Sequence, residues 1–294
     1  MSPTWLAFFR FNIAVFALLH FMAIQPDFND LFTFKGYIYP DILNAEYDHH
    51  SLTFLSLKDM LAQVHINIAY ETLLTIFRIV YPVCLILLAL GCFTRIAAIG
   101  SLFFQLLFIK SIHLYEYGVD YYSTIALFYC CVFPVGRVNS LDMRIFKKSG
   151  EVNSAIYLTV FKIHLCIAYF FSGFDKVIGD SWRSGEALWK SLHSHAYYSL
   201  FSLDFMASTP FFFIGCWATI ILEMLYCIFM NIERTRKYWL AGIVLLHLFI
   251  ALFMGLFFFS ALMIILNLSA FYAPHYMDGL VFKRKKREEI AVAA

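Results

Sequence analysis

Charged side chains are scarce in this sequence. Only 14% of its 294 residues are Asp, Glu, Lys or Arg, whereas a soluble domain usually carries about a quarter. Because 62% of the residues are hydrophobic, the core of a water-soluble protein could not bury all the apolar side chains and leave a polar surface. The scarcity of charge therefore excludes a water-soluble globular protein and indicates that lipid surrounds the chain.

The sequence also lacks the cysteine patterns of a disulfide framework or a metal site. Its seven cysteines lie in or beside apolar runs, and Cys130 and Cys131 are adjacent rather than spaced as C-x-x-C. We therefore predict neither disulfides nor a metal. The N-terminus has no charged leader or small-residue cleavage site, and Arg10 interrupts its apolar run, so we expect it to remain as a membrane span.

Long apolar runs are what the sequence has instead. Several are close to the roughly 20 residues that a helix needs to cross a bilayer, and they are continuous rather than alternating, which excludes a transmembrane β-barrel. The prediction is an all-α, polytopic helical membrane protein. Its eight predicted spans are 4–24, 71–91, 96–114, 121–136, 154–175, 210–230, 237–254 and 256–273.

The distribution of basic residues predicts how these spans are oriented. An even number of spans places both termini on one side, and the basic tail 274–294 contains "FKRKKRE". In this arrangement the cytoplasmic segments hold 13 of the 22 basic residues, and the outer loops 25–70 and 176–209 hold five. Because basic residues favour the cytoplasmic side, both termini are predicted to be cytoplasmic. Without an internal repeat or a soluble domain, residues 1–294 are predicted to form a single transmembrane domain.

Charges inside the spans require partners, because an unpaired charge in hydrocarbon is costly. Lys162 and Glu223 lie at similar depths in two spans that run in opposite directions, so we predict that they form a buried ion pair with a structural role. Arg10 lies in the same third of the membrane and is predicted either to join this network or to extend to the lipid headgroups.

A second group of polar side chains lies near the outer ends of the spans. Because several helices direct such groups to one level, we predict a polar cavity that opens to the outside. Its members are His20, Arg78, Lys110, His113, Glu116, Asp120, Asp175, Lys176 and His247.

Some of these residues also have simpler interpretations. Lys176 together with Trp182 is typical of an anchor at the membrane interface, where Lys extends to water and Trp lies at headgroup depth. His113 fits a helix cap, and His20 and His247 fit buried histidines bonded to carbonyls. Facing each other at equal depth, these last two histidines would instead bind a b-type haem.

One stretch points to a known family. "SGFDKVIGDSWRSGEAL", which begins at Ser172, resembles the segment of vitamin K-dependent γ-glutamyl carboxylases in which a glycine precedes a catalytic lysine and a D-x-W-x-x-G-like sequence follows. The bacterial relatives are the horizontally transferred transmembrane (HTTM) domain proteins. The stretches "LAFFRFNIAVF", "ALGCFTRIAAIGSL", "GVDYYSTIALFYCCVFP" and "LLHLFIALF" are similar to that family in the same order, so the resemblance covers nearly the whole chain.

The resemblance implies a chemistry as well as a fold. In the family a lysine takes a proton from a reduced naphthoquinone, oxygen adds, and the resulting strong base removes a γ-proton from a glutamate, whose carbanion captures carbon dioxide. This implies reduced menaquinone or a vitamin K-like hydroquinone as cofactor, and an active face outside the bacterial cytoplasmic (inner) membrane. We expect Lys176, Asp120, His113 and His247 to be catalytic, and Arg78, His20 and Trp182 to bind the cofactor.

The chain also departs from the animal enzymes. Asp175 stands where they have another lysine, no histidine is present near Val119 and Asp120, and their large lumenal β-rich domain is lacking. Two functions therefore stay open. One is a quinol-linked enzyme that modifies an exported peptide or a small substrate at the outer face. The other is a non-catalytic, partner-dependent factor that matures a secreted peptide toxin, as in sporulation-delaying toxin systems.

The two hypotheses differ in the partners that they require. Both place the protein in a lipid bilayer and neither involves nucleic acid, but the second needs a small partner protein. A transporter is disfavoured, because the sequence has no repeated halves and no paired interrupted helices.

Overall fold

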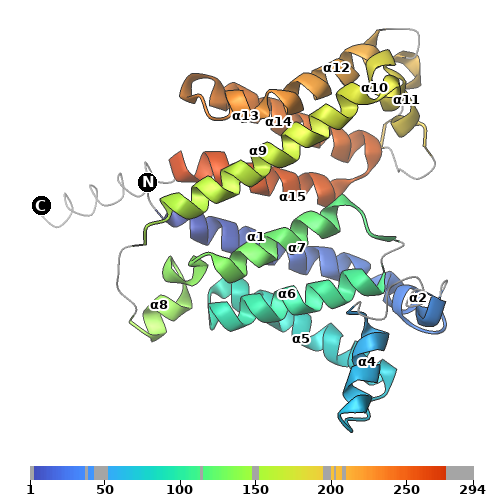
Figure 1. Cartoon of the computed structure of the whole chain (residues 1–294), viewed down its shortest axis with the longest axis vertical. Coiled ribbons are helices and arrows are strands. Elements are labelled where there is room, and N and C mark those ends of the chain that lie inside the picture. The colour runs from blue at the N-terminus through green and yellow to red at the C-terminus, as the bar shows by residue number, and fades with distance from the viewer. Residues whose placement is uncertain are drawn as a thin grey trace, which may run out of the picture. The chain divides into compact units, whose positions relative to one another are not determined.

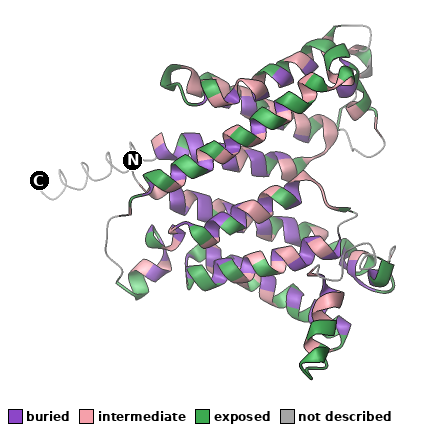
Figure 2. Cartoon of the chain, in the orientation of Figure 1, coloured by how far each residue is buried: buried purple, intermediate pink, exposed green. Residues whose placement is uncertain are grey.

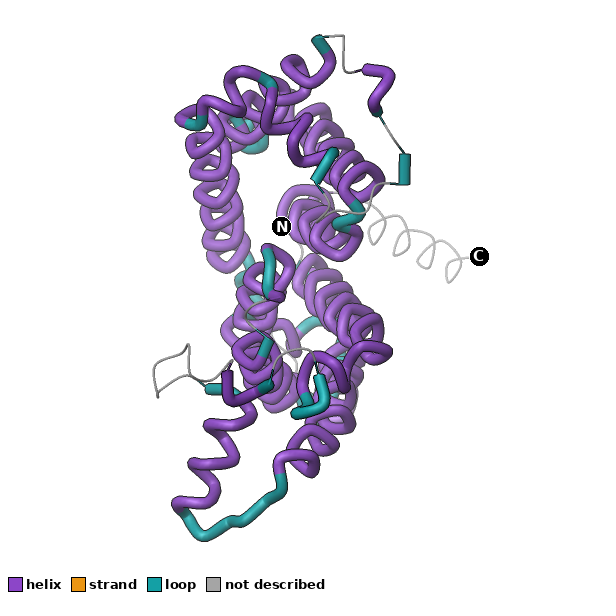
Figure 3. The backbone as a smooth tube through the Cα atoms, turned by 90° about the vertical axis from the view of Figure 1, so that its right-hand side faces the viewer, coloured by secondary structure: helices purple, strands orange, loops and turns teal. Residues whose placement is uncertain are grey.

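The computed structural model describes residues 3–36, 39–42, 52–112, 115–147, 152–194, 200–201, 203–206 and 210–275. Within these ranges every regular element is a helix, as Figures 1 and 3 show. The prediction of an all-α protein is therefore confirmed for the part of the chain that the structure describes. Most of the basic tail 274–294 lies outside the described residues.

The chain divides into two compact units, which are described separately below. The N-terminal unit comprises Leu6–Val152, and the C-terminal unit comprises Asn153–Ala294 together with Met1–Trp5. The helices of the N-terminal unit are α1 (Thr4–Ile24, whose first two residues belong to the other unit), η1 (Gln25–Asp27), α2 (Phe28–Phe32), α4 (Phe54–Gln63), α5 (Tyr70–Leu90), α6 (Thr94–Ser111), α7 (Gly118–Val132), η3 (Val135–Arg137) and α8 (Leu141–Ile145).

The C-terminal unit contains both long and short helices. Its helices are α9 (Ala155–Ile178), α10 (Asp180–Ser184), α11 (Glu186–Leu192), η4 (Asp204–Met206), α12 (Phe211–Met224), α13 (Tyr226–Phe229), α14 (Glu233–Met254), α15 (Phe257–Asn267) and the π-helical turn η5 (Leu268–Tyr272). The predicted outer loop 176–209 is thus partly helical, because α10, α11 and η4 lie within it.

Aromatic packing holds the N-terminal unit together. The helices α5, α6 and α7 follow one another side by side (Figure 1). The fully buried ring of Phe77 on α5 lies 5.3 Å from Phe21, 4.9 Å from Phe54 and 6.2 Å from Phe108, measured between ring centroids. Each buried aromatic ring contributes a large apolar area. Phe54, which belongs to the predicted outer loop 25–70, therefore packs onto the helices.

Arg10 binds backbone, and both predictions for it are wrong. Its side chain is 3% exposed, and its terminal nitrogens donate to the carbonyl oxygens of Val135 at 2.6 Å, Val138 at 3.1 Å and Asn139 at 2.9 Å. The residues after α7 therefore satisfy its two terminal nitrogens, whereas Nε has no hydrogen-bond partner among the described residues. Arg10 thus does not extend to the headgroups, and the network of Lys162 and Glu223 that it was predicted to join does not form, because Glu223 binds Lys176. The contacts tie α1 to η3 and to the residues that follow it.

In the C-terminal unit, α9 packs on α12 and α14 packs on α15 (Figure 1). The short helices α10 and α11 continue the chain beyond α9 and pack on the first half of α12, where Ala187, Leu188, Phe212 and Cys216 form a buried cluster. Gly185 joins α10 to α11 with φ +89°, a conformation that favours glycine. A Cβ there would also lie 2.8 Å from the Cα of Phe213, so only glycine allows this close approach.

Within the described ranges, six helical segments are long and apolar enough to cross a membrane. They are Thr4–Phe32, Tyr70–Leu90, Thr94–Ser111, Ala155–Ile178, Glu233–Met254 and Phe257–His275. The predicted spans 121–136 and 210–230 correspond to the shorter helices α7, with 15 residues, and α12, with 14. The total of eight spans and the cytoplasmic position of both termini stay predictions.

The outward surface of α9 shows what surrounds the protein. Its exposed large side chains recur every three to four residues and are apolar, among them Ile156, Ile163, Ile167, Phe171 and Phe174. Figure 2 shows the corresponding exposed positions in green along α9. A soluble protein rarely exposes so continuous an apolar surface. Together with the spanning helices, this surface identifies an integral membrane protein.

Candidate functional site

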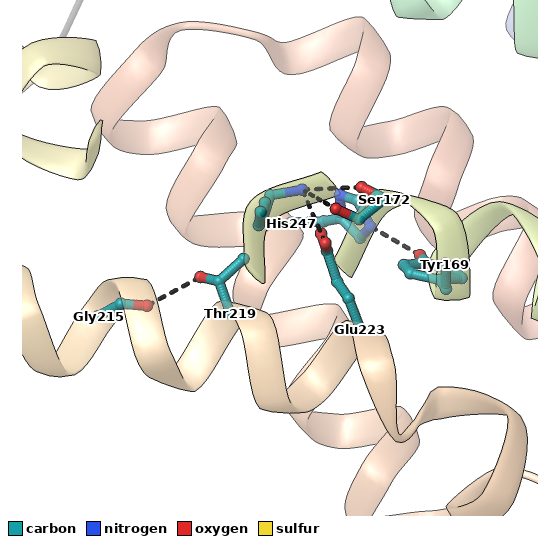
Figure 4. A network of polar contacts seen from close by, with 7 residues as sticks. Tyr169, Ser172, Gly215, Thr219, Glu223 and His247 are labelled. Carbon is teal, nitrogen blue, oxygen red and sulfur yellow. Dashed lines mark hydrogen bonds and ion pairs between the residues drawn. The ribbon is translucent and has the colours of Figure 1, made fainter. Parts of the chain in front are cut away.

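The final turns of α9 carry the stretch that resembles the carboxylase motif. Lys176 Nζ lies 2.7 Å from Glu223 Oε2 on α12 and 2.7 Å from Ser172 Oγ, and it donates more weakly to the Ser172 carbonyl oxygen at 3.3 Å. Figure 4 shows Ser172 and Glu223 converging from their two helices. The ammonium is therefore held by one residue from its own helix and one from a neighbouring helix.

The ion pair is largely buried. The side chain of Lys176 is 17% exposed and that of Glu223 is 9% exposed. By contrast, Asp175, the acid adjacent to the lysine in sequence, is exposed, because consecutive residues on a helix point in different directions. The carboxylate that matters to Lys176 therefore comes from α12.

The predicted pair between Lys162 and Glu223 is wrong. Glu223 binds Lys176 instead, and the ammonium of Lys162 lies 4.9 Å from the centroid of the Phe271 ring. The prediction assumed that α9 and α12 begin and end at matching levels. In the structure the first half of α12 packs against α10 and α11, beyond the end of α9. This offset brings Glu223 to the level of Lys176.

Gly173 makes the pair geometrically possible. A Cβ at this position would lie 2.7 Å from the backbone nitrogen of Met224 and 3.0 Å from Glu223 Cβ. No real side chain fits at such distances, so α9 and α12 approach closely only because residue 173 is glycine. The three residues Ser172, Gly173 and Lys176 therefore serve one purpose, which is to bring the ammonium and the carboxylate together.

Trp182 closes another side of the ammonium. Lys176 Nζ lies 5.1 Å from the centroid of the Trp182 ring, a distance typical of a cation–π contact. The ring belongs to α10 and packs against the buried cluster of α11 and α12. The structure thus brings together two predicted site residues, Lys176 and Trp182, and the contacts of Lys176 are inside the protein rather than with water alone.

His247 lies on α14 beside this pair. It is 3% exposed, and its Nε2 lies 2.8 Å from the hydroxyl of Tyr169. In Figure 4 the imidazole lies between Tyr169 and the Ser172–Glu223 group. The other ring nitrogen, Nδ1, is buried and has no hydrogen-bond partner among the described residues. A third predicted site residue therefore belongs to the same cluster.

Besides Ser172 and Glu223, the cluster contains Tyr169 and Asn267, which were also absent from the predicted site residues. The hydroxyl of Tyr169 accepts a hydrogen bond from Asn267 Nδ2 at 2.7 Å, and both residues are buried. Signals for both exist in the sequence. Tyr169 precedes Lys176 by two helical turns and so shares its face of α9, and Asn267 is the one amide in the apolar run "ALMIILNLSA".

In the N-terminal unit, the predicted residue Asp120 caps a helix. It is 3% exposed, and its carboxylate accepts a hydrogen bond from the backbone nitrogen of Tyr117 at 3.0 Å, at the start of α7. Tyr117 lies between two predicted spans. Burial is the larger and the charge of Asp120 the smaller cause that raises the pKa of the Tyr117 hydroxyl to about 12, so this hydroxyl stays protonated at neutral pH. The immediate role of the Asp120 carboxylate is to satisfy the helix terminus.

The remaining predicted residues lie in the same unit. Arg78 is exposed, donates from Nε to Gln25 Oε1 at 3.0 Å and lies over the Phe28 ring at 4.7 Å. His20 is buried next to the rings of Phe16 and Phe108. His113 lies outside the described residues. The roles of these residues, the cavity shared by all of them and the alternative haem site between His20 and His247 stay predictions.

The cluster on the C-terminal unit can bind and move protons. It offers an amine, a carboxylate, a flat indole ring and an imidazole nitrogen that has no hydrogen-bond partner among the described residues. The described residues contain no group of three or more His, Cys, Asp or Glu side chains arranged to hold a metal ion.

Comparison with known proteins gives one match. A family model described as the HTTM domain matches residues 2–276, which include every residue of the cluster. No protein of curated function and no solved structure matches the chain.

Proposed function

The chain belongs to the HTTM domain family, a group related to the vitamin K-dependent carboxylases, and on this premise we propose that it is a quinol-linked membrane enzyme. Its substrate would be an exported peptide or a small molecule, modified at the extracytoplasmic face of the bacterial cytoplasmic membrane. Lys176 would act as the base, with reduced menaquinone or a similar hydroquinone as cofactor.

One observation carries this proposal. The buried pair of Lys176 and Glu223 lies beside the imidazole of His247, whose Nδ1 is buried and has no hydrogen-bond partner in the part of the chain that the structure describes. A purely structural ion pair needs only its two charges and their hydrogen bonds. Buried polar atoms are almost always paired in proteins, so an unpaired nitrogen at this position supports a ligand as the missing partner.

The residues present fit a hydroquinone. A hydroquinone is a flat aromatic ring whose oxygen atoms both donate and accept hydrogen bonds, and the cluster offers the indole of Trp182, the amine of Lys176 and the imidazole of His247. When bound with oxygen, such a group would supply the strong base that removes a proton from the substrate carbon. The fit supports a cofactor of the naphthoquinone class.

Glu223 has a defined part in this scheme. An ammonium has no lone pair, so Lys176 Nζ must release a proton before it can accept one. Glu223 Oε2 is 2.7 Å away and can take that proton, and Ser172 Oγ, also at 2.7 Å, keeps the nitrogen in place. Because both charged side chains are largely buried, bulk water is kept from the exchange. The base is therefore the pair, rather than the lysine alone.

The test replaces Lys176 by Ala in the full chain, reconstituted in right-side-out vesicles with reduced menaquinone, oxygen and labelled bicarbonate. Exported peptides of the source cell are added outside and analysed by mass spectrometry. We expect product formation to fall by about 100-fold or more, since general-base catalysis contributes on this order. Lys190→Ala is the matched control, because Lys190 pairs with Glu186 at the exposed surface of α11. Full activity of Lys176→Ala would refute the proposal.

A second candidate is a partner-dependent factor that matures a secreted peptide toxin. The exposed apolar side chains of Trp189, Phe201 and Phe205 in the outer segment favour it, since such groups are suited to docking a partner. In a toxin-maturation assay, this function predicts that Phe205→Ala reduces toxin output while Lys176→Ala does not. The reverse result would support the enzyme.

A further inference from the structure

Four buried side chains form a continuous hydrogen-bond chain in the C-terminal unit. The hydroxyl of Tyr226 on α13 donates to Asn267 Oδ1 at 2.6 Å, Asn267 Nδ2 donates to the Tyr169 hydroxyl at 2.7 Å, and that hydroxyl lies 2.8 Å from His247 Nε2. All four residues are at most 3% exposed. The chain therefore links α13, α15, α9 and α14 out of contact with water.

The chemistry of Asn267 gives this chain one direction. Its Nδ2 also donates to the backbone carbonyl of Met263 at 2.8 Å, which fixes the amide nitrogen on that side. The amide oxygen, which can only accept, then faces Tyr226, so the hydroxyl of Tyr226 must donate to it. The second proton of Nδ2 points to the oxygen of Tyr169. The two hydrogen bonds that the amide makes with the tyrosines thus both run in the direction from Tyr226 to Tyr169.

The direction continues to the imidazole. Because the Tyr169 oxygen accepts from Asn267, its own proton is available for His247 Nε2, which then acts as the acceptor. A neutral imidazole that accepts at Nε2 carries its proton on Nδ1. This nitrogen is the one that is buried without a partner. The chain therefore ends in an N–H group directed at nothing in the described protein.

We infer that Tyr226, Asn267 and Tyr169 position His247 as a hydrogen-bond donor, so that the site selects a ligand with an acceptor oxygen next to Lys176. The identity of that ligand as a naphthoquinone or naphthohydroquinone rests on the proposed function. There the amine side of the cluster accepts a proton from a ligand hydroxyl, and the N–H of His247 stabilises the negative charge left on oxygen. His247 would touch the ligand, and the three residues behind it act through His247.

The test determines the tautomer of His247 directly. The full chain is prepared in lipid nanodiscs with ¹⁵N-labelled histidine, and the His247 signals are assigned by their loss in His247→Ala. In the ligand-free protein we expect the proton on Nδ1. A proton on Nε2 would overturn the inference whatever the activity of the protein.

Asn267→Asp is designed to reverse the chain. A carboxylate at this position accepts from both tyrosine hydroxyls, so the Tyr169 oxygen would accept from His247 and the proton would move to Nε2. Tyr169→Phe, a milder change, should abolish the preference for either nitrogen. Tyr81→Phe is the matched control, because Tyr81 is a buried tyrosine that bonds to Gln105 in the other unit, and it should leave the signals unchanged. Unchanged signals in both Asn267→Asp and Tyr169→Phe would also overturn the inference.

The ligand is tested with 2-methyl-1,4-naphthoquinone, whose oxygens only accept hydrogen bonds. Titration should shift the Nδ1 signal of the unsubstituted protein, and Asn267→Asp should weaken binding by about tenfold, as expected for one lost hydrogen bond. If the Nδ1 signal does not shift at a saturating concentration of the quinone, the assignment of this ligand class is refuted. Because the tautomer is measured without turnover, this result is independent of the activity of Lys176→Ala. A proton on Nδ1 together with full activity of Lys176→Ala would refute the proposed enzymatic function but would support the inferred direction of the hydrogen-bond chain.

Discussion

Arg10 in the N-terminal unit and Lys176 in the C-terminal unit are both basic residues inside helices, yet they are satisfied in different ways. Among the described residues, Arg10 donates to the backbone carbonyls of Val135, Val138 and Asn139. Lys176 is bonded to the side chains of Glu223 and Ser172. A carbonyl cannot take a proton at neutral pH, whereas a carboxylate can. The first arrangement fixes a fold, and the second can also exchange protons.

The same contrast holds for the acids. Asp142 accepts from the backbone nitrogens of Phe93 and Thr94 at 2.7 and 2.8 Å and so caps the start of α6. Glu223 accepts from an amine. Asp142 is thus held by backbone nitrogens and the hydroxyl of Thr94, whereas Glu223 is held by an ionisable amine with which it can exchange a proton.

The largest effect on stability is expected at Arg10. Arg10→Met leaves three carbonyl oxygens unpaired in the interior, and we expect the free energy of unfolding to fall by about 3–5 kcal/mol. Unfolding in mixed detergent measures this change. Arg95→Met, at an exposed position, is the control and should be nearly neutral. Activity per folded molecule should not change. A selective loss of activity in Arg10→Met would contradict a purely structural role of Arg10.

A smaller change in stability, but a large one in activity, is expected at Glu223. Glu223→Gln keeps the shape of the side chain but removes the proton acceptor of Lys176, so product formation should fall by about 100-fold. The matched control is Glu186→Gln, which breaks the exposed pair with Lys190 and should leave activity unchanged. Equal activity of the two variants would show that Glu223 is as structural as Asp142.

The smallest effect is expected from the glycine between the two helices. Gly173→Ala places a methyl group 2.7 Å from the backbone nitrogen of Met224, which should lower the free energy of unfolding by about 1–3 kcal/mol and separate Lys176 from Glu223. At Gly179 a Cβ would meet nothing closer than 3.5 Å, so Gly179→Ala is the control. Thermal unfolding of both variants, with activity measured alongside, tests the close contact. Equal stability would disprove it.

The sequence predicts what depends on neighbouring residues along the chain. The long helices were foreseen because their apolar runs are continuous, and Lys176 with Trp182 was foreseen because both lie in one recognisable stretch. The partner of Glu223 was not, since its level relative to α9 depends on how α10 and α11 pack against α12. The site of Arg10 was missed for a related reason, because backbone carbonyls leave no trace in a sequence.

Residues of the hydrogen-bond chain show a third kind of limit. Tyr169 and Tyr226 look like ordinary members of an apolar run, and only their hydroxyl contacts distinguish them. Those contacts join four helices, so no local pattern can reveal them. In the N-terminal unit, by contrast, the position of Asp120 three residues after Tyr117 is a local capping pattern.

The short helix α10 follows α9 in the chain and contributes Trp182, whose ring faces the ammonium of Lys176. Its C-terminal end is fixed by the close approach of Gly185 to Phe213. One side of the cluster is thus formed by a separate five-residue helix, while Lys176 and Glu223 belong to α9 and α12. Substitutions in α10 would change the space around a ligand bound by the proposed enzyme without moving Lys176 or Glu223. In the proposed enzyme, ligand preference and catalytic rate would therefore depend on different segments of the chain and could change independently.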